Sequence, residues 1–205
     1  MGGDFFEFQE LPVGLAVTVA DACGRGASAA AVAEECRLAV RRALGEVGEP
    51  ALVAEHVNQR MVTDPPSELF VTAFFGLIDR SEPRLHYVSA GHGPAWHYSA
   101  AREQLQELNV QRYPLGLSLD GCFDRPGVVH FEPGDFVVVV TDGFFEWIDG
   151  QEQCFGVERL CSEILRHRAR DASDLIDCLH RELLSFAGRN PQCDDLTAVV
   201  IKRIT

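Results

Sequence analysis

Residues 15–44 read LAVTVADACGRGASAAAVAEECRLAVRRAL, and the change of pattern within them decides the fold class. The apolar, partly β-branched run at 15–20 predicts a buried strand that ends at Asp21. A glycine-rich turn follows at 23–26, and the alanine-rich run at 28–44 carries its apolar residues on one stripe, which predicts an amphipathic helix. A buried strand therefore passes into a helix across a turn that begins with a carboxylate.

The other elements come in blocks. Helical periodicity predicts helices at 49–61, 157–168 and 173–186. The first of these begins at Glu49-Pro50, because proline is well tolerated in the first turn of a helix. Runs rich in valine, phenylalanine and tyrosine predict an antiparallel meander at 69–78, 84–90 and 95–98, and an apolar run predicts a last strand at 196–201. The Pro-Gly turn at 132–135 predicts a hairpin between strands at 128–131 and 136–140.

These blocks do not alternate in the strand–helix–strand manner of a parallel sheet. We therefore expect an α+β fold, a layered α-β-β-α sandwich in which two antiparallel sheets pack face to face and are flanked by helix pairs. The length of 205 residues and the hydrophobic content of 46% suit a single globular domain over residues 1–205.

Composition excludes several classes of function. The net charge of -13 and the pI near 4.9 argue against nucleic acid as a partner, because binding to phosphates needs clustered Lys and Arg. The seven cysteines are odd in number and form no C-x-x-C pair, which favours a reduced, cytoplasmic setting. No apolar run approaches the roughly 20 residues of a membrane span, so we expect no membrane insertion.

Four aspartates stand where a strand meets a turn: Asp4, Asp21, Asp142 and Asp194. One aspartate in a turn is ordinary, but carboxylates gathered at the ends of several buried strands cost desolvation energy unless cations balance them. Asp142 has the strongest pattern, because it follows four consecutive valines and Thr141, and Gly143 permits close backbone approach. Oxygen-only ligands favour Mg²⁺, Mn²⁺ or Ca²⁺ over zinc.

Several motifs occur together in a fixed order along the chain. They are Gly2-Gly3-Asp4-Phe5, Asp21-Ala22-Cys23-Gly24-Arg25-Gly26, Leu69-Phe70-Val71-Thr72, Ala90-Gly91-His92-Gly93-Pro94, Pro114-Leu115-Gly116-Leu117, Phe131-Glu132-Pro133-Gly134-Asp135, Thr141-Asp142-Gly143 and Asp194-Asp195-Leu196-Thr197. As a set they resemble the bacterial SpoIIE/RsbU-type branch of the PPM, or protein-phosphatase-2C-like, phosphatases. The resemblance runs from Gly2 nearly to the C-terminus.

The resemblance implies a β-sandwich with flanking helix pairs and a serine/threonine protein phosphatase that acts through a metal-activated water. Its cofactors would be two divalent cations, Mn²⁺ or Mg²⁺, and its substrate a phosphoprotein such as an anti-sigma-factor antagonist. The residues that match the family's metal ligands are Asp4, Asp21, Asp142 and Asp194, with the backbone carbonyl of Ala22. Asp195 would be an extra ligand or a support for the ligands. From the residues alone, Gly143 permits close approach beside Asp142, and Glu146, four residues after Asp142, would either orient a metal-bound water or only cap local structure.

Two groups are candidates for contact with the substrate phosphate. Gly24, Arg25 and Gly26 open a helix, where backbone N–H groups and a guanidinium favour an anion, although a plain helix cap with a solvated arginine has the same sequence. The family commonly has lysine at position 25. His92 has the side-chain type of a proton donor, but a turn histidine with a local hydrogen bond is the simpler interpretation.

Two other hypotheses stay open at this point. A catalytically degenerate phosphatase fold could bind a regulatory partner protein, although that role gives no reason to cluster four aspartates. A diguanylate cyclase is suggested by Gly2-Gly3-Asp4-Phe5 alone, and the other motifs do not belong to that family. The chain begins almost at its first metal motif, so we expect the catalytic part of a longer protein with an N-terminal sensor or receiver domain. A homodimer is an open alternative for its assembly.

Overall fold

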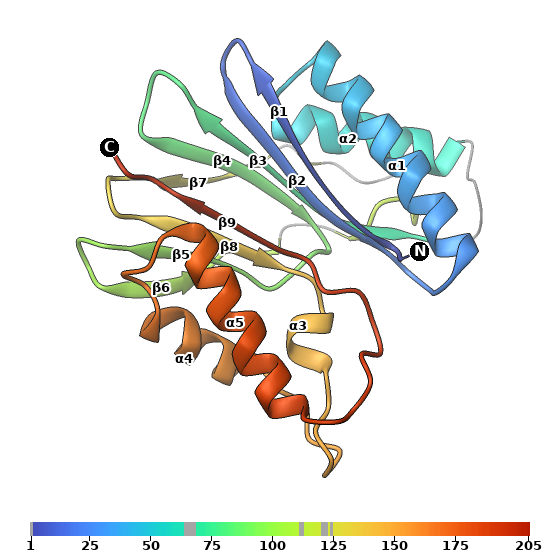
Figure 1. Cartoon of the computed structure of the whole chain (residues 1–205). Coiled ribbons are helices and arrows are strands. Elements are labelled where there is room, and N and C mark those ends of the chain that lie inside the picture. The colour runs from blue at the N-terminus through green and yellow to red at the C-terminus, as the bar shows by residue number, and fades with distance from the viewer. Residues whose placement is uncertain (1, 64–68, 111–112, 120–122, 124) are drawn as a thin grey trace. The chain divides into compact units, whose positions relative to one another are not determined.

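The computed structural model describes residues 2–63, 69–110, 113–119, 123 and 125–205, which form two compact units. Unit 1 comprises Met1–Gly93 and Leu108–Phe131, and unit 2 comprises Pro94–Glu107 and Glu132–Thr205. Each unit holds one antiparallel sheet (Figure 1). Among the described helices, none combines the length and the apolar character that a bilayer span requires.

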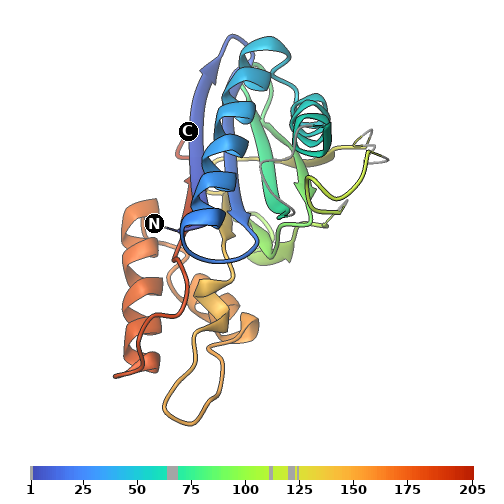
Figure 2. The ribbon, with the colours of Figure 1, turned by 90° about the vertical axis from the view of Figure 1, so that its right-hand side faces the viewer.

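Unit 1 has a five-stranded sheet in the order β1-β2-β3-β4-β7. Its elements are β1 (Asp4–Leu11), β2 (Gly14–Ala22), α1 (Ala27–Glu46), α2 (Pro50–Thr63), β3 (Val71–Asp79), β4 (Arg84–Ala90) and β7 (Gly127–His130). Helices α1 and α2 cover one face of this sheet (Figure 2). The stripe of α1 that faces the sheet is small, with Ala29, Ala33 and Cys36 buried, so the helix approaches β1 and β2 closely.

Unit 2 has a four-stranded sheet in the order β6-β5-β8-β9. Its elements are β5 (Ala95–Ser99), β6 (Gln104–Glu107), β8 (Phe136–Val140), α3 (Gly143–Glu146), α4 (Val157–Arg166), α5 (Ala172–Ala187) and β9 (Ala198–Lys202). All five residues of β8 are buried, as expected for a central strand. Apolar residues of α4 and α5, such as Ile164 and Leu179, share one core with Val138 of β8.

The structure confirms the α+β class, the antiparallel sheets and the helix pair on each sheet. Two strand pairings predicted from the sequence are wrong. Strand β5 does not continue the meander of β3 and β4 but pairs with β6 and β8. Strands β7 and β8 do not form a hairpin, because β7 pairs with β4 whereas β8 pairs with β5 and β9.

Hydrogen bonds on the two sides of the Pro-Gly turn explain this crossing from sheet to sheet. Before the turn, the N–H of Phe131 donates to the carbonyl of Pro83 in unit 1 at 2.8 Å. After the turn, the buried carboxylate of Asp135 accepts from the N–H of Ala100 at 2.7 Å and lies 3.2 Å from Nε2 of His97, both in unit 2. A turn type read from four residues carries no information about such long-range partners.

Candidate metal centre

Asp4 and Asp21 lie directly opposite each other on neighbouring antiparallel strands of unit 1. Asp4 is the first residue of β1 and Asp21 the penultimate residue of β2, and the register of the two strands pairs them. Residues directly opposite in a ladder point to the same face, and like charges in that position destabilise a sheet. The register thus creates a two-carboxylate site that favours a bound cation.

Gly3 shapes the backbone beside these two carboxylates. The N–H of Ala22 donates to the carbonyl of Gly3 at 3.1 Å. A Cβ at position 3 would lie 2.6 Å from the carbonyl oxygen of Ala22 and 3.1 Å from Oδ1 of Asp21. Only glycine therefore lets the chain run this close to the Ala22 carbonyl, the oxygen expected to join the aspartates as a ligand.

Thr72 connects this end of the sheet to His92. It lies opposite Asp21 on β3, and its hydroxyl donates to the Asp21 carbonyl at 3.5 Å and lies 3.0 Å from Nδ1 of His92. His92 is 3% exposed. The local hydrogen bond that the sequence left as the simpler interpretation of His92 is present, and it fixes the ring near Asp21. Sequence reasoning gave Thr72 no role, because its motif predicts a strand but not that this strand pairs with the strand of Asp21.

The segment Gly24-Arg25-Gly26 forms the turn that opens α1. Gly24 and Gly26 have φ angles of 102° and 77°, in the left-handed region that favours glycine. Gly26 is the N-cap residue, the cap has no side-chain hydrogen bond, and the first turn carries no acidic side chain. Arg25 is exposed. The arrangement suits an anion, because helix N-terminal N–H groups and a guanidinium both attract one.

Asp142 stands in unit 2 between β8 and the short helix α3, where it is the N-cap residue. Its backbone carbonyl accepts from the N–H groups of Phe145 at 2.9 Å and Glu146 at 2.8 Å, whereas its side chain makes no capping hydrogen bond. Capping, the ordinary role of an aspartate here, therefore does not account for the carboxylate.

Gly143 brings the segment of Asp194 and Asp195 next to Asp142. A Cβ at position 143 would collide with the backbone carbonyl oxygen of Asp195. Beside it, the N–H of Thr141 donates to the carbonyl of Thr197 at 3.0 Å, and the Thr141 hydroxyl accepts from the N–H of Thr197 at 3.1 Å. Two segments that are distant in sequence are thereby held together at the aspartates.

The pKa of Glu146 indicates a strongly negative electrostatic environment in this part of unit 2. Desolvation raises the pKa of its carboxyl above the usual value, and the charges of Asp142 and Asp194 raise it further. Three carboxylates thus lie within electrostatic reach of one another. A bound cation would relieve this repulsion, and the all-oxygen donor set suits Mg²⁺ or Mn²⁺.

The predicted residues therefore divide into two groups according to the unit in which they lie. The group in unit 1 contains Asp4, Asp21, Ala22, Gly24, Arg25, Gly26 and His92, and the group in unit 2 contains Asp142, Gly143, Glu146, Asp194 and Asp195. Both groups offer carboxylate oxygens and have a glycine where a backbone carbonyl approaches closely.

Comparison with known proteins gives a consistent answer. The family model described as Stage II sporulation protein E (SpoIIE) matches residues 12–204. Phosphoserine phosphatase RsbU of Bacillus subtilis (strain 168) is 26% identical over 209 residues, which cover 99% of this chain and 60% of RsbU. Phosphoserine phosphatase RsbP of the same organism is 24% identical over 152 residues, which cover 71% of this chain and 37% of RsbP. The chain thus spans less than two thirds of these relatives' length.

Solved structures extend the match to the fold. The SiaA-PP2C domain of Pseudomonas aeruginosa superposes with a TM-score of 0.87 at 26% identity, over 98% of this chain and 80% of that domain. The PP2C phosphatase domain of SpoIIE from Bacillus subtilis, with a fragment of its regulatory domain, gives a TM-score of 0.83 at 19% identity, over 98% of this chain and 57% of that one. On the family match over almost its whole length, this chain belongs to the SpoIIE family, within the PPM phosphatases.

Proposed function

We propose that this chain is a metal-dependent serine/threonine protein phosphatase domain in which Asp4, Asp21, Asp142 and Asp194 hold two divalent cations, Mn²⁺ or Mg²⁺. The observation that carries the proposal is the register of β1 and β2, which sets Asp4 opposite Asp21. A sheet has no structural reason to face two like charges across a ladder. In unit 2, the negative charges of Asp142 and Asp194 near Glu146 likewise favour a bound cation.

The relatives support this reaction class. RsbU and RsbP are named phosphoserine phosphatases, and SiaA contributes a PP2C domain. One structure of similar fold, RsbX, is a complex with magnesium. The donor set here agrees with such a cation, because all the expected ligands are oxygens.

The chain's own residues would divide the work as follows. Bound cations would supply the positive charge that activates a water and neutralises the phosphoryl oxygens, so no side-chain nucleophile is required. The four aspartates and the Ala22 carbonyl hold the cations, and Asp195 and Glu146 support that set. Arg25, with the N–H groups between Gly24 and the first turn of α1, receives the substrate phosphate.

His92 takes a positioning or proton-donating role in this proposal. Its ring is buried and oriented by Thr72, which also contacts the Asp21 carbonyl. A ring held in this way is suited to deliver a proton to the leaving serine oxygen after a small movement of its loop. The ring in its present buried state does not reach a phosphoprotein.

The proposed substrate is a protein that carries phosphoserine or phosphothreonine, of the anti-sigma-factor antagonist type. The RsbU and RsbW domains of Rv1364c from Mycobacterium tuberculosis, solved together, resemble this chain over 56% of their length, with a TM-score of 0.79. They support the view that such domains work inside longer regulated proteins, here with an N-terminal sensor or receiver domain. The described cysteines are free thiols, which agrees with the cytoplasm as location, and a homodimer stays an alternative for the assembly.

The direct test is hydrolysis of p-nitrophenyl phosphate and of a phosphoserine peptide with Mn²⁺, Mg²⁺ or EDTA. We expect metal-dependent turnover by the wild type and its loss in Asp142→Ala, with Asp177→Asn, an exposed aspartate of α5, as the matched control. No turnover by a folded wild-type protein with either metal would favour the degenerate module that binds a regulatory partner.

A further inference from the structure

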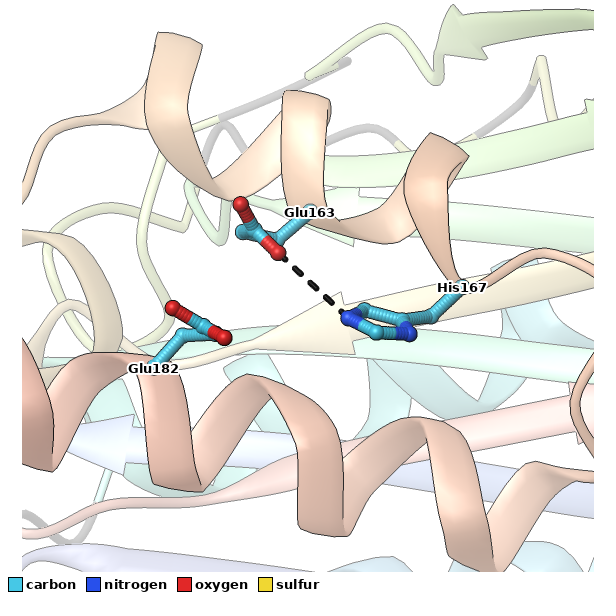
Figure 3. Close-up of side chains that lie close together, drawn as sticks. All are labelled: Glu163, His167 and Glu182. Carbon is cyan, nitrogen blue, oxygen red and sulfur yellow. Dashed lines mark ion pairs between the residues drawn. The ribbon is translucent and has the colours of Figure 1, made fainter.

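Helices α4 and α5 bring together a second set of metal-ligand side chains, away from the aspartates of unit 2 in sequence. Glu163 lies on α4, His167 caps the C-terminal end of that helix, and Glu182 lies on α5. One ligand atom from each residue lies within 4.8 Å of the other two. Figure 3 shows the three side chains pointing into the space between the two helices.

The ring of His167 gives an independent sign of a ligand. Its Nε2 atom is buried and makes no hydrogen bond with the described part of the chain, although Oε2 of Glu163 is 3.4 Å away. Buried polar nitrogens almost always have a hydrogen-bond partner, whereas the contact of this atom is an ion pair with the Glu163 carboxylate. The side chains of Glu163 and His167 are 15% and 16% exposed, whereas Glu182 is 43% exposed. The site is therefore enclosed on the α4 side and accessible from the α5 side.

Arg166 is the cation that now lies at this site. Its Nη1 atom is 3.2 Å from Oε2 of Glu163 and 3.8 Å from Oε1 of Glu182. The arginine side chain is 62% exposed, and ion pairs at that exposure contribute little to stability. A divalent ion that enters between the carboxylates can displace the guanidinium, which then extends into solvent.

We propose that Glu163, His167 and Glu182 form a second metal site that takes a borderline transition cation such as Zn²⁺ and clamps α4 to α5. An imidazole nitrogen with two carboxylates is a ligand set of the zinc type, unlike the oxygen-only set of the aspartates. Three protein ligands leave a coordination position for water. Glu163 and His167 have the four-residue spacing that puts two ligands on one helical face, a signal present in the sequence as E-x-x-x-H.

The experiment measures bound zinc per chain and thermal unfolding in the presence of excess Mg²⁺. We expect Glu182→Gln and His167→Ala each to bind one Zn²⁺ fewer than the wild type. We also expect them to lose a zinc-dependent rise in Tm of about 5–10 °C at a free Zn²⁺ concentration near 100 times Kd. His180→Ala, an exposed histidine of α5, is the matched control and should bind as the wild type does.

A third variant separates a metal site from a network of ion pairs. Arg166→Gln removes the competing cation, so zinc affinity should rise by about two- to fivefold. Unchanged zinc stoichiometry in both Glu182→Gln and His167→Ala would overturn the proposal. The metal-dependent turnover of Glu182→Gln at saturating Mn²⁺ should match the wild type, so this result does not depend on whether the aspartate centre is a phosphatase.

Discussion

The two units position their aspartates by different structural devices. In unit 1, Asp4 and Asp21 belong to the first hairpin, and eight successive residue pairs of β1 and β2 fix where they lie. In unit 2, Asp142 and Asp194 stand outside the strands, and their segments are held together by Gly143 and by Thr141 with Thr197. A strand slip of one residue would turn Asp4 to the opposite face, whereas one added methyl group would separate the segments of unit 2.

This difference predicts which single substitutions should disturb each group of aspartates. A ladder distributes its geometry over many backbone hydrogen bonds, so single side-chain changes leave the backbone in place. A close backbone contact depends on one glycine, and a single substitution there alters both the fold and the site. The positions of the aspartates in unit 1 are therefore fixed by many backbone hydrogen bonds, whereas the positions of the aspartates in unit 2 depend on a few contacts.

The largest expected effect is on phosphatase activity, and it should be the same for the aspartates of both units. Asp21→Asn and Asp142→Asn each keep the side-chain shape but remove a charged ligand, so kcat/KM for a phosphoserine peptide with Mn²⁺ should fall by at least about 100-fold, since residues that merely support a ligand already cost 10–100-fold. The measurement is steady-state kinetics over a range of Mn²⁺ concentrations. An undiminished rate in either variant would remove that unit from the catalytic centre.

The next effect should separate the halves by stability. Gly143→Ala forces a Cβ against the Asp195 carbonyl, so it should lower the free energy of unfolding by about 1–3 kcal/mol or more. Gly150→Ala, where a Cβ would meet nothing within 4 Å, should stay within about 0.5 kcal/mol of the wild type. Urea denaturation followed by circular dichroism gives both values. Equal stability of the two variants would contradict the close contact in unit 2.

The smallest effect concerns the metal-free protein. Asp4→Asn removes the like charge opposite Asp21, so unfolding without metal should need about 0.2–1 kcal/mol more free energy than in the wild type. The same variant should lose the stabilisation that Mn²⁺ gives to the wild type. Thermal unfolding with EDTA and with Mn²⁺ measures both, and a variant that is less stable in EDTA would contradict the like-charge interpretation.

Sequence patterns predicted the local structure of this fold better than its pairings. The strand, turn and helix of residues 15–44 and the buried run before Asp142 are confirmed, because apolar periodicity reports burial directly. The hairpin after residue 128 was wrong because its turn residues are the same whether the next strand returns to its own sheet or joins another one. The meander failed at β5 for the same reason.

The candidate site could also be predicted only in part from the sequence. The aspartates were visible in the sequence because each stands next to a predicted strand or a glycine motif. Thr72 and the cluster of Glu163, His167 and Glu182 were not, since each depends on which elements pack together. The sequence also gave no strand at β1, so the register that pairs Asp4 with Asp21 came only from the structure.

The central claim is that Asp4, Asp21, Asp142 and Asp194 hold two divalent cations, and Mn²⁺ electron paramagnetic resonance tests it most directly. Two ions held by shared carboxylates lie about 3.5–4 Å apart and couple magnetically. We predict a coupled Mn²⁺ pair in the wild type that disappears in both Asp21→Asn and Asp142→Asn. Isolated Mn²⁺ signals in the wild type, or a coupled pair that survives in either variant, would contradict the account.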